Sequence, residues 1–337
     1  MHACRKILFP LSWLYGAILA LRHLLYDKKI LSSVAHPVPL IGIGNLSFGG
    51  TGKTPMTEYL IRLLKDRYRM AVLSRGYKRA TSGFYLAREG VSVRDIGDEP
   101  FQYYKKFPGI EVAVDADRNR GIARLLQLPI PPEVILLDDA FQHRKIQPGL
   151  HILLTTCDDL YVDDFLFPAG NLRDLKSRAA RADLIIVTKC PTALTGTERL
   201  HIKNKLNLKP RQQIFFSGIT YANELVSATE KLQLKALQKE PFTLVTGIAR
   251  PGPLVRFLKE KGLTFGHIRY PDHYEFTEKD IALLQRKTRV ITTEKDYMRL
   301  QHRLPGVYYL PIQTTFLEEE ATFISTIERF IKSYGKV

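Results

Sequence analysis

The sequence contains little cysteine. Its 337 residues include Cys4, Cys157 and Cys190, which are too few and too scattered for a disulfide framework or a zinc site. It also lacks internal repeats and low-complexity segments. An apolar fraction of 45% with 25% charged residues is ordinary for folded chains, which excludes intrinsic disorder, collagen and a multispan membrane protein. We therefore predict a folded protein of a reducing compartment with about two domains.

Acidic residues are scarce relative to basic ones. Lys plus Arg number 50 and Asp plus Glu number 34, so 50 − 34 gives a formal net charge of +16. Such a charge favours an anionic partner, which could be nucleic acid, an acidic membrane surface or a phosphorylated small molecule. The basic residues are spread along the chain and no DNA- or RNA-binding motif is present, so we expect no nucleic-acid partner.

The chain also lacks a hydrophobic run of comfortable transmembrane length. The uncharged segment 7–21 is shorter than the roughly 20 residues of a spanning helix, and it contains Pro10 and Ser12. Cations flank this segment, so we expect residues 1–32 to form an amphipathic helix that docks on an anionic membrane surface. A first helix packed on the core and a signal peptide are the alternatives. The residues that recur at helical spacing are Leu11, Leu14, Tyr15, Ile18, Leu21 and Leu25.

A glycine-rich loop between a predicted strand and a predicted helix is the clearest motif. Residues 38–44 (VPLIGIG) predict a buried parallel strand, and residues 55–64 carry the apolar stripe of a helix. The loop between them, NLSFGGTGKT, has the composition of a P-loop, although Ser47 stands where the strict pattern has its first glycine. In a P-loop, backbone N–H groups and a lysine hold phosphates, and a threonine hydroxyl binds magnesium. The predicted nucleotide contacts are Asn45, Phe48, Gly49, Gly50, Thr51, Gly52, Lys53 and Thr54.

An apolar strand that ends in two acids is the expected partner of this loop. Residues 133–139 (EVILLDD) place Asp138 and Asp139 at the carboxyl end of a strand, where open α/β sheets bind their ligands. Together with Thr54 they are predicted to hold Mg²⁺. Residues 188–191 (TKCP) lack the aspartate with which GTP-specific P-loop proteins select guanine, so ATP is the expected nucleotide.

The other strands and helices alternate along the chain. This pattern predicts an α/β fold with a doubly wound parallel sheet in residues 33–220, the nucleotide-binding and catalytic domain, and a second, smaller α/β domain in residues 221–337. The further predicted strands are 70–74, 110–114, 151–155, 183–187, 213–217, 242–246, 264–269, 289–293 and 307–311. The further predicted helices are 117–128, 197–208, 253–261, 277–287 and 319–332.

Two adjacent carboxylates in residues 97–100 (GDEP) are candidates for activating an acceptor. If the turn predicted there faces the γ-phosphate, one carboxylate could accept a proton while the other helps to hold the metal ion. Viewed alone, an Asp-Glu pair in a loop is more often solvated surface, and His273 is more often structural. Three charged pairs could bind phosphate or one another, namely Asp117-Arg118, His143-Arg144 and Arg173-Asp174.

The order of these motifs resembles that of the tetraacyldisaccharide 4′-kinases, the lipid A 4′-kinases of Gram-negative bacteria. The resemblance covers nearly the whole chain, to about residue 300. It implies transfer of the γ-phosphoryl group of ATP to the 4′-hydroxyl of an acylated glucosamine disaccharide 1-phosphate at the cytoplasmic face of the bacterial inner membrane. The segments that carry it are NLSFGGTGKTP (45–55), SRGY (74–77), GDEP (97–100), LDDAFQHR (137–144), FPAGNLRD (167–174), PDHYEFT (271–277) and TEKD (293–296).

The resemblance also implies roles for individual residues. Asp98 would be the catalytic base and His273 would pair with it, while Lys53 would act on the transferred phosphate. Glu99 would join Thr54, Asp138 and Asp139 around Mg²⁺. The segments near the acceptor or the phosphates would contribute Arg75, Tyr77, Arg118, His143, Arg173 and Asp174.

Two other functions remain open at this point. One is a membrane-associated P-loop ATPase switch, in which water accepts the phosphoryl group. The other is a kinase for a soluble sugar, which would not need an amphipathic N-terminus. The P-loop alone is compatible with each of them.

Overall fold

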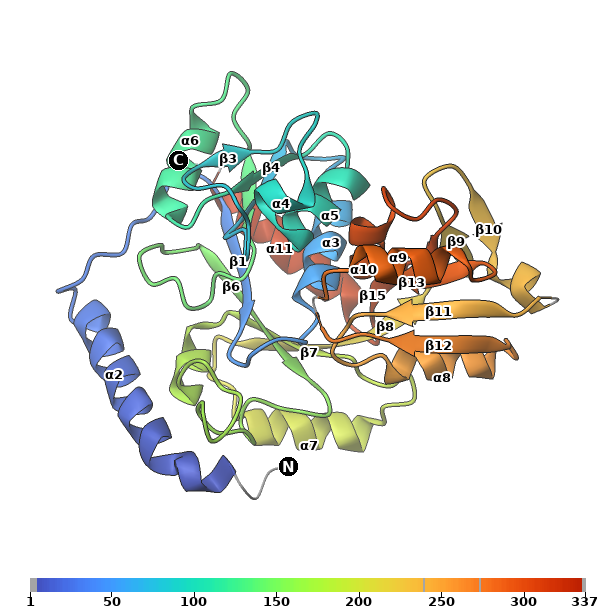
Figure 1. Cartoon of the computed structure of the whole chain (residues 1–337). Coiled ribbons are helices and arrows are strands. Elements are labelled where there is room, and N and C mark those ends of the chain that lie inside the picture. Colours follow the sequence, from blue (N-terminus) through green and yellow to red (C-terminus); the bar gives the residue numbers. More distant parts are fainter. Residues whose placement is uncertain (1–4, 239, 273, 335–337) are drawn as a thin grey trace.

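Parallel strands form the frame of the molecule. The computed structural model describes residues 5–238, 240–272 and 274–334. Among these residues, helices and strands build two sheets that stand side by side, and helix α2 (Phe9–Asp27) lies on the far side of the larger one (Figure 1). The mixed α/β class predicted from the sequence is therefore confirmed.

The larger sheet, counted over the described residues, has nine strands. Its seven inner strands are all parallel, and the two edge strands run antiparallel to their neighbours. The inner strands are continuous apolar runs because both faces of a parallel sheet are covered. In spatial order the strands are β15 (Ile312–Phe316), β8 (Gln213–Tyr221), β7 (Leu184–Thr188), β6 (Leu150–Thr156), β1 (Leu40–Asn45), β5 (Val134–Leu137), β2 (Met70–Ser74), β4 (Glu111–Val114) and β3 (Tyr85–Leu86).

The smaller sheet has six strands within the described part of the chain. Four of them are parallel, and β9 and β10 extend one edge in antiparallel fashion. The order is β10 (Lys231–Gln233), β9 (Glu224–Val226), β14 (Tyr308–Leu310), β13 (Val290–Thr293), β11 (Phe242–Thr246) and β12 (Phe265–Arg269).

The helices follow the predicted alternation, with short additions. Each predicted strand and helix has a counterpart within a few residues of its expected bounds. The helices beside α2 are η1 (Lys6–Leu8), α3 (Lys53–Leu64), α4 (Val93–Ile96), α5 (Asp98–Lys106), α6 (Arg118–Leu126), η2 (Lys176–Arg181), α7 (Gly196–Leu206), η3 (Leu234–Gln238), α8 (Gly252–Glu260), α9 (Glu278–Gln285), α10 (Glu294–Leu300) and α11 (Glu320–Tyr334). In the parts of the chain that are described, no helix combines the length and the apolar content needed to cross a membrane.

The end of the chain returns to the larger sheet. Strand β15 pairs with β8, with Ile312 opposite Tyr221. Helix α11 follows, and its Phe323 packs against Phe215 and Phe316 at ring-centroid distances of 5.3 and 4.6 Å. The segment 221–337, which the sequence predicted as one unit, thus contributes to both sheets. The chain enters the smaller sheet after β8 and returns to the larger one at β15.

A buried charge cluster joins the two sheets. Lys106 on α5 lies 2.7 Å from Glu58 on α3 and also contacts Glu294 on α10. Both carboxylates are buried, with exposed fractions of 1% for Glu58 and 4% for Glu294. Burial, together with the charge of Glu58, raises the pKa of Glu294 to about 7. Lys106 therefore offsets the repulsion between the two buried carboxylates where α3, α5 and α10 meet.

Replacing this cation should destabilise the fold. In Lys106→Met, the buried Glu294 loses its ion pair and Glu58 keeps Arg62, at 3.3 Å, as its cationic partner, so we expect the free energy of unfolding to fall by about 3–5 kcal/mol. Urea denaturation measures this change. Lys65→Met is the matched control, because Lys65 pairs with the exposed Asp66 and such pairs contribute about 0–1 kcal/mol. Equal losses in the two variants would contradict the assignment.

Candidate active site

The glycine-rich loop connects the end of β1 to the start of α3. Gly49, Gly50 and Gly52 have φ angles of 68°, 58° and 85°. A Cβ atom on Gly49 or Gly50 would meet nothing within 4 Å. The need for glycine therefore comes from the left-handed backbone and not from crowding. The Lys189 side chain, which the sequence analysis did not assign, donates to the carbonyl oxygen of Gly50 and fixes the outer side of the loop.

A polar cluster lies at the base of this loop. The Asn45 side chain donates to Thr51 Oγ1 at 2.8 Å, and its oxygen accepts from Lys53 Nζ at 3.4 Å and from Arg173 Nη2 at 2.5 Å. Asp139 lies 3.6 Å from Lys53 Nζ and binds Arg173 through both carboxylate oxygens. Two cations from distant parts of the chain thus share one amide and one carboxylate, where an anionic ligand would meet both.

The two acids after β5 lie in different environments. Asp138 is 4% exposed; its Oδ2 is 3.4 Å from Ser74 Oγ, and its Oδ1 has no hydrogen-bond partner among the described residues. Burial, then the charges of Asp139 and Glu99, raise the pKa of Asp138 to about 7. Burial also acts on Asp139, but Arg173 and Lys53 hold its pKa well below the usual range. The pKa values of the two neighbouring carboxyls are therefore shifted in opposite directions.

These residues fit a magnesium ion. No group of three His, Cys, Asp or Glu side chains within the described ranges is arranged to hold a metal. Mg²⁺ commonly binds one or two carboxylates together with substrate phosphates and water, so a smaller donor set suffices. The buried, unpartnered oxygen of Asp138 is such a donor, and a cation there would offset the charges that raise its pKa. Thr54, half-buried in the first turn of α3, supplies a hydroxyl.

Asp98 and Glu99 begin helix α5, where the sequence predicted a turn. Pro100 is acceptable in a first helical turn, and acids are favoured there by the helix dipole. The preceding Gly97 has φ 90°, and a Cβ atom on it would lie 2.9 Å from the Tyr77 carbonyl oxygen. The loop after β2 therefore packs closely on the start of α5 because residue 97 is glycine.

The Asp98 carboxylate forms an ion pair that the sequence analysis missed. Arg299 on α10 binds both of its oxygens, with Nε 3.1 Å from Oδ1, and also donates to the Tyr274 carbonyl at 3.2 Å. Glu99 lies 3.9 Å from Lys295 on the same helix. The sequence signal that could have indicated this partner is the cation Arg299, which follows the TEKD segment closely. His273, the predicted partner of Asp98, lies outside the described residues.

Cationic and imidazole groups line a pocket near the end of β5, where its lining residue Arg118 contacts Asp138. Arg118 is 2% exposed and donates to the carbonyls of Asp115 at 2.5 Å and Asp138 at 3.2 Å. Burial, then the charges of Arg118 and Arg75, lower the pKa of His143 to about 4, so its imidazole is neutral at pH 7. The pocket has a volume of about 340 Å³, and its lining includes Arg22, Tyr26, Arg118, His143, Arg144 and Lys145.

Three predicted site residues lie elsewhere or face solvent. Phe48 is 54% exposed and packs on Phe167 at a ring-centroid distance of 5.5 Å. Tyr77 is 62% exposed. Asp174 is fully buried beneath α2 and binds His23, so its carboxylate does not reach the site that Arg173 occupies. This placement does not support its predicted contact with substrate, because the Asp174 side chain binds His23 while the Arg173 side chain binds Asn45 and Asp139.

Comparison with known proteins agrees with the motif order. A family model described as tetraacyldisaccharide-1-P 4′-kinase matches residues 4–332. The tetraacyldisaccharide 4′-kinases of Flavobacterium johnsoniae and Bacteroides thetaiotaomicron are 48% and 44% identical, with 98% and 94% of this chain and 98% and 90% of theirs covered.

A solved structure extends this similarity to the fold. It is the "apo" form of LpxK from Aquifex aeolicus in complex with ATP, which has a TM-score of 0.80 and 33% identity to this chain and covers 97% of it and 99% of the LpxK chain. The resemblance predicted from the sequence is thus confirmed. The chain belongs to the tetraacyldisaccharide 4′-kinase family.

Proposed function

We propose that this protein transfers the γ-phosphoryl group of ATP to the 4′-hydroxyl of tetraacyldisaccharide 1-phosphate, giving the bis-phosphorylated lipid A precursor. The observation that carries the proposal is that Lys53 and Arg173 both reach Asn45 and Asp139 at the glycine-rich loop, in a chain of this family. The relatives are named for this activity, and the similar LpxK structure contains ATP.

The geometry supports separate roles for the residues around ATP, the phosphoryl donor. The loop N–H groups and Lys53 would bind the phosphates of ATP. Arg173, whose charge Asp139 balances in this structure, would bind them as well. Mg²⁺ held by Thr54, Asp138, Asp139 and Glu99 would neutralise charge on the β- and γ-phosphates.

Asp98 is the proposed base. Its carboxylate would take the proton from the 4′-hydroxyl as that oxygen bonds to the γ-phosphorus, the bond to the bridging oxygen breaks, and ADP leaves. Arg299 binds both oxygens of Asp98 and fixes the orientation of the carboxylate. His273 is proposed to assist Asp98, as the family resemblance implies.

The pocket between α2 and α6 is the proposed site of the acceptor headgroup. Arg118 and His143 line it, while Arg75 and Tyr77 belong to the loop packed on Gly97. Arg22 and Lys145 add positive charge that suits the 1-phosphate of the acceptor. A phosphorylated sugar headgroup, with its acyl chains directed toward α2, would account for the position of this pocket beside the N-terminal helix.

The exposed side of α2 is the proposed docking surface on the cytoplasmic face of the inner membrane. Trp13, Leu14, Ile18 and Leu21 are between 58% and 73% exposed. Large apolar side chains gathered on one side of a helix are costly in water and favourable at a bilayer interface.

Transfer of label from γ-labelled ATP to the lipid fraction tests the reaction. With Mg²⁺ and tetraacyldisaccharide 1-phosphate, we expect label in the lipid, whereas an ATPase switch would release label only as free phosphate. In Asp98→Asn, kcat should fall by about 10²–10⁴ with ATP affinity nearly unchanged. Asp66→Asn, an exposed acid, is the control. An Asp98→Asn protein with normal turnover would remove Asp98 from the base role.

Magnesium binding should depend on pH through Asp138. Its folded-state pKa of about 7 lies above the ordinary value of 3.8, so the metal-free protein holds an extra proton between these values and loses stability as pH rises through them. Mg²⁺ must displace that proton, and affinity should rise about tenfold from pH 6 to pH 8.

Calorimetric titration of the ATP complex with MgCl₂ measures this effect. Asp138→Asn lacks the titrating group and controls for the titration of ATP itself, so it should show weaker binding and a smaller pH dependence. Identical pH profiles for the two proteins would contradict the role of Asp138.

Membrane docking can be tested on the α2 surface without deleting the helix. Leu14→Asp and Ile18→Asp should each weaken binding to vesicles containing phosphatidylglycerol by about tenfold or more, because an apolar contact is replaced by a charge. Leu283→Asp on α9, an exposed leucine on the other side of the molecule, should bind as the wild type does. Vesicle sedimentation gives the comparison, and an equal loss in all three would point to a nonspecific effect.

A further inference from the structure

Helix α2 turns its polar residues toward the protein. Ser12, His23 and Tyr26 are buried, whereas Trp13 and Leu14 are exposed. Ser12 Oγ accepts from the Ala169 N–H at 3.0 Å and donates to the Leu166 carbonyl at 3.0 Å. The helix is therefore held to the body of the protein by specific hydrogen bonds, which fix its rotation more closely than apolar packing would.

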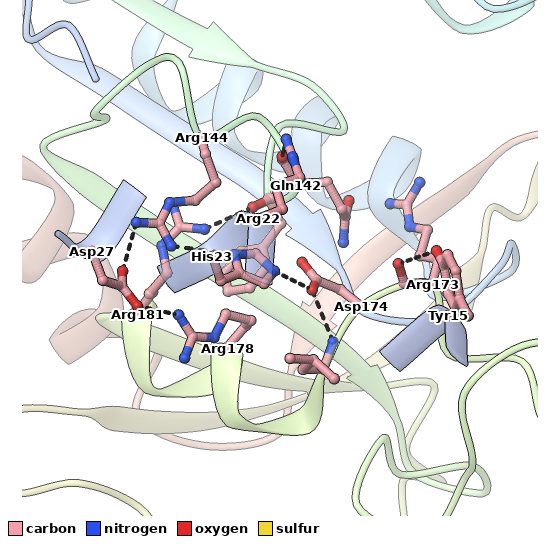
Figure 2. A network of polar contacts seen from close by, with 12 residues as sticks. Tyr15, Arg22, His23, Asp27, Gln142, Arg144, Arg173, Asp174, Arg178 and Arg181 are labelled. Atoms are coloured by element: carbon pink, nitrogen blue, oxygen red, sulfur yellow. Dashed lines mark hydrogen bonds and ion pairs between the residues drawn. The ribbon is translucent and has the colours of Figure 1, made fainter. Parts of the chain in front are cut away.

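Two further contacts of helix α2 meet residues 173 and 174 (Figure 2). Tyr15 Oη donates to the backbone carbonyl of Arg173 at 2.9 Å, and His23 Nε2 lies 2.6 Å from Asp174 Oδ1. Both residues of the second pair are buried, at 1% and 0% exposure. Helix α2 thus holds the peptide unit that carries the Arg173 side chain.

The same short segment is bonded to the glycine-rich loop on its other side. The Arg173 N–H donates to the Leu46 carbonyl at 2.8 Å, and the Phe48 N–H donates to the Asn171 carbonyl at 2.8 Å. The Arg173 side chain then reaches Asn45 and Asp139. A continuous set of hydrogen bonds therefore leads from α2 through Arg173 to the groups expected to meet phosphate.

The protonation pattern of His23 follows from its partners. Arg144 Nη1, which can only donate, lies 3.3 Å from His23 Nδ1, so Nδ1 is the acceptor and Nε2 carries the hydrogen donated to Asp174. Arg144 also binds Asp27 at 2.7 Å, and Arg178 binds the other oxygen of Asp27 at 2.9 Å (Figure 2). This chain of contacts holds the last turns of α2.

Asp174 depends on His23. Its Oδ1 accepts from His23 and from the Leu175 N–H at 2.8 Å, and its Oδ2 has no partner among the described residues. Within that part of the chain, no other side chain hydrogen-bonds this buried carboxylate. Loss of the imidazole would leave the buried carboxylate with the Leu175 N–H as its one hydrogen-bond donor among the described residues, and would displace the segment next to Arg173.

We propose that Tyr15 and His23 are positioning residues, which set Arg173 at the phosphate end of the site from helix α2. Helix α2 then has two tasks: its exposed side contacts lipid, and its buried side orders the donor site. This inference rests on the kinase activity proposed above, and its ATP-binding part can be measured without any acceptor.

Tyr15→Phe in the full chain is the sharpest test, because it removes one hydroxyl and keeps the ring. We expect kcat to fall about two- to tenfold and ATP affinity measured without acceptor to weaken, as one hydrogen bond to the Arg173 peptide is lost. Vesicle binding and Tm should stay at wild-type values. Tyr308 on β14 is the control: Tyr308→Phe loses a comparable hydroxyl contact, to Glu230, and should match the wild type.

His23 gives a graded second test. His23→Ala should lower kcat about 10- to 100-fold, and His23→Gln, whose amide can still donate to Asp174, should recover part of the loss. If His23→Ala does not fold, Tyr15→Phe and His23→Gln decide the matter.

Two results would overturn the inference. One is normal kcat and ATP affinity in Tyr15→Phe. The other is a loss in Tyr15→Phe that disappears at saturating acceptor in detergent micelles and parallels weaker vesicle binding, since α2 would then be an anchor only. A wild-type protein that binds ATP but does not phosphorylate the lipid would instead overturn the proposed function, and the ATP affinity of Tyr15→Phe would still test the coupling.

Discussion

The pairing of Arg173 with Asp139 is the interaction on which the rest of the site depends. Lys53 and Arg173 both reach Asn45, and two cations so close together require a counter-charge. Asp139 supplies it from the end of β5, in a left-handed backbone conformation with φ 51° that aims the side chain at the loop. Its neighbour Asp138 is left with a protonation equilibrium near neutrality. Arg173 and Lys53 lower the pKa of Asp139 while burial raises that of Asp138, and Asp139 holds in place two cations proposed to bind phosphate.

Much of the frame could be predicted from the sequence because its signals are local. Buried parallel strands such as β2 and β5 are uninterrupted apolar runs, and a left-handed loop needs glycine at fixed places. Strand β15 was missed because it lies at the edge of the sheet, and its sequence IQTTF is not the continuous apolar run that marks the inner strands. Helix α5 was expected as a turn because its first residues, Asp98 to Pro100, have turn composition.

The partners of the site residues could not be predicted in this way. Arg299 meets Asp98 across 201 positions and His23 meets Asp174 across 151, and such long-range pairs leave no periodic pattern in a single chain. The family resemblance implied that Asp174 lies with Arg173 near the acceptor or the phosphates. In the structure their side chains separate: that of Arg173 joins the glycine-rich loop, and that of Asp174 is buried under α2.

The return of the chain to the larger sheet has a mechanical consequence. The smaller sheet is an insertion whose two connections leave from the paired strands β8 and β15, and they are joined where the Ala222 N–H donates to the Pro311 carbonyl at 2.9 Å. Two connections fixed side by side act as a double tether and restrict relative motion largely to rotation about a single axis. Arg299 travels with the inserted unit, while Asp98 stays with the frame. The placement of the smaller sheet therefore determines the distance between the Arg299 guanidinium and the carboxylate proposed to begin the reaction.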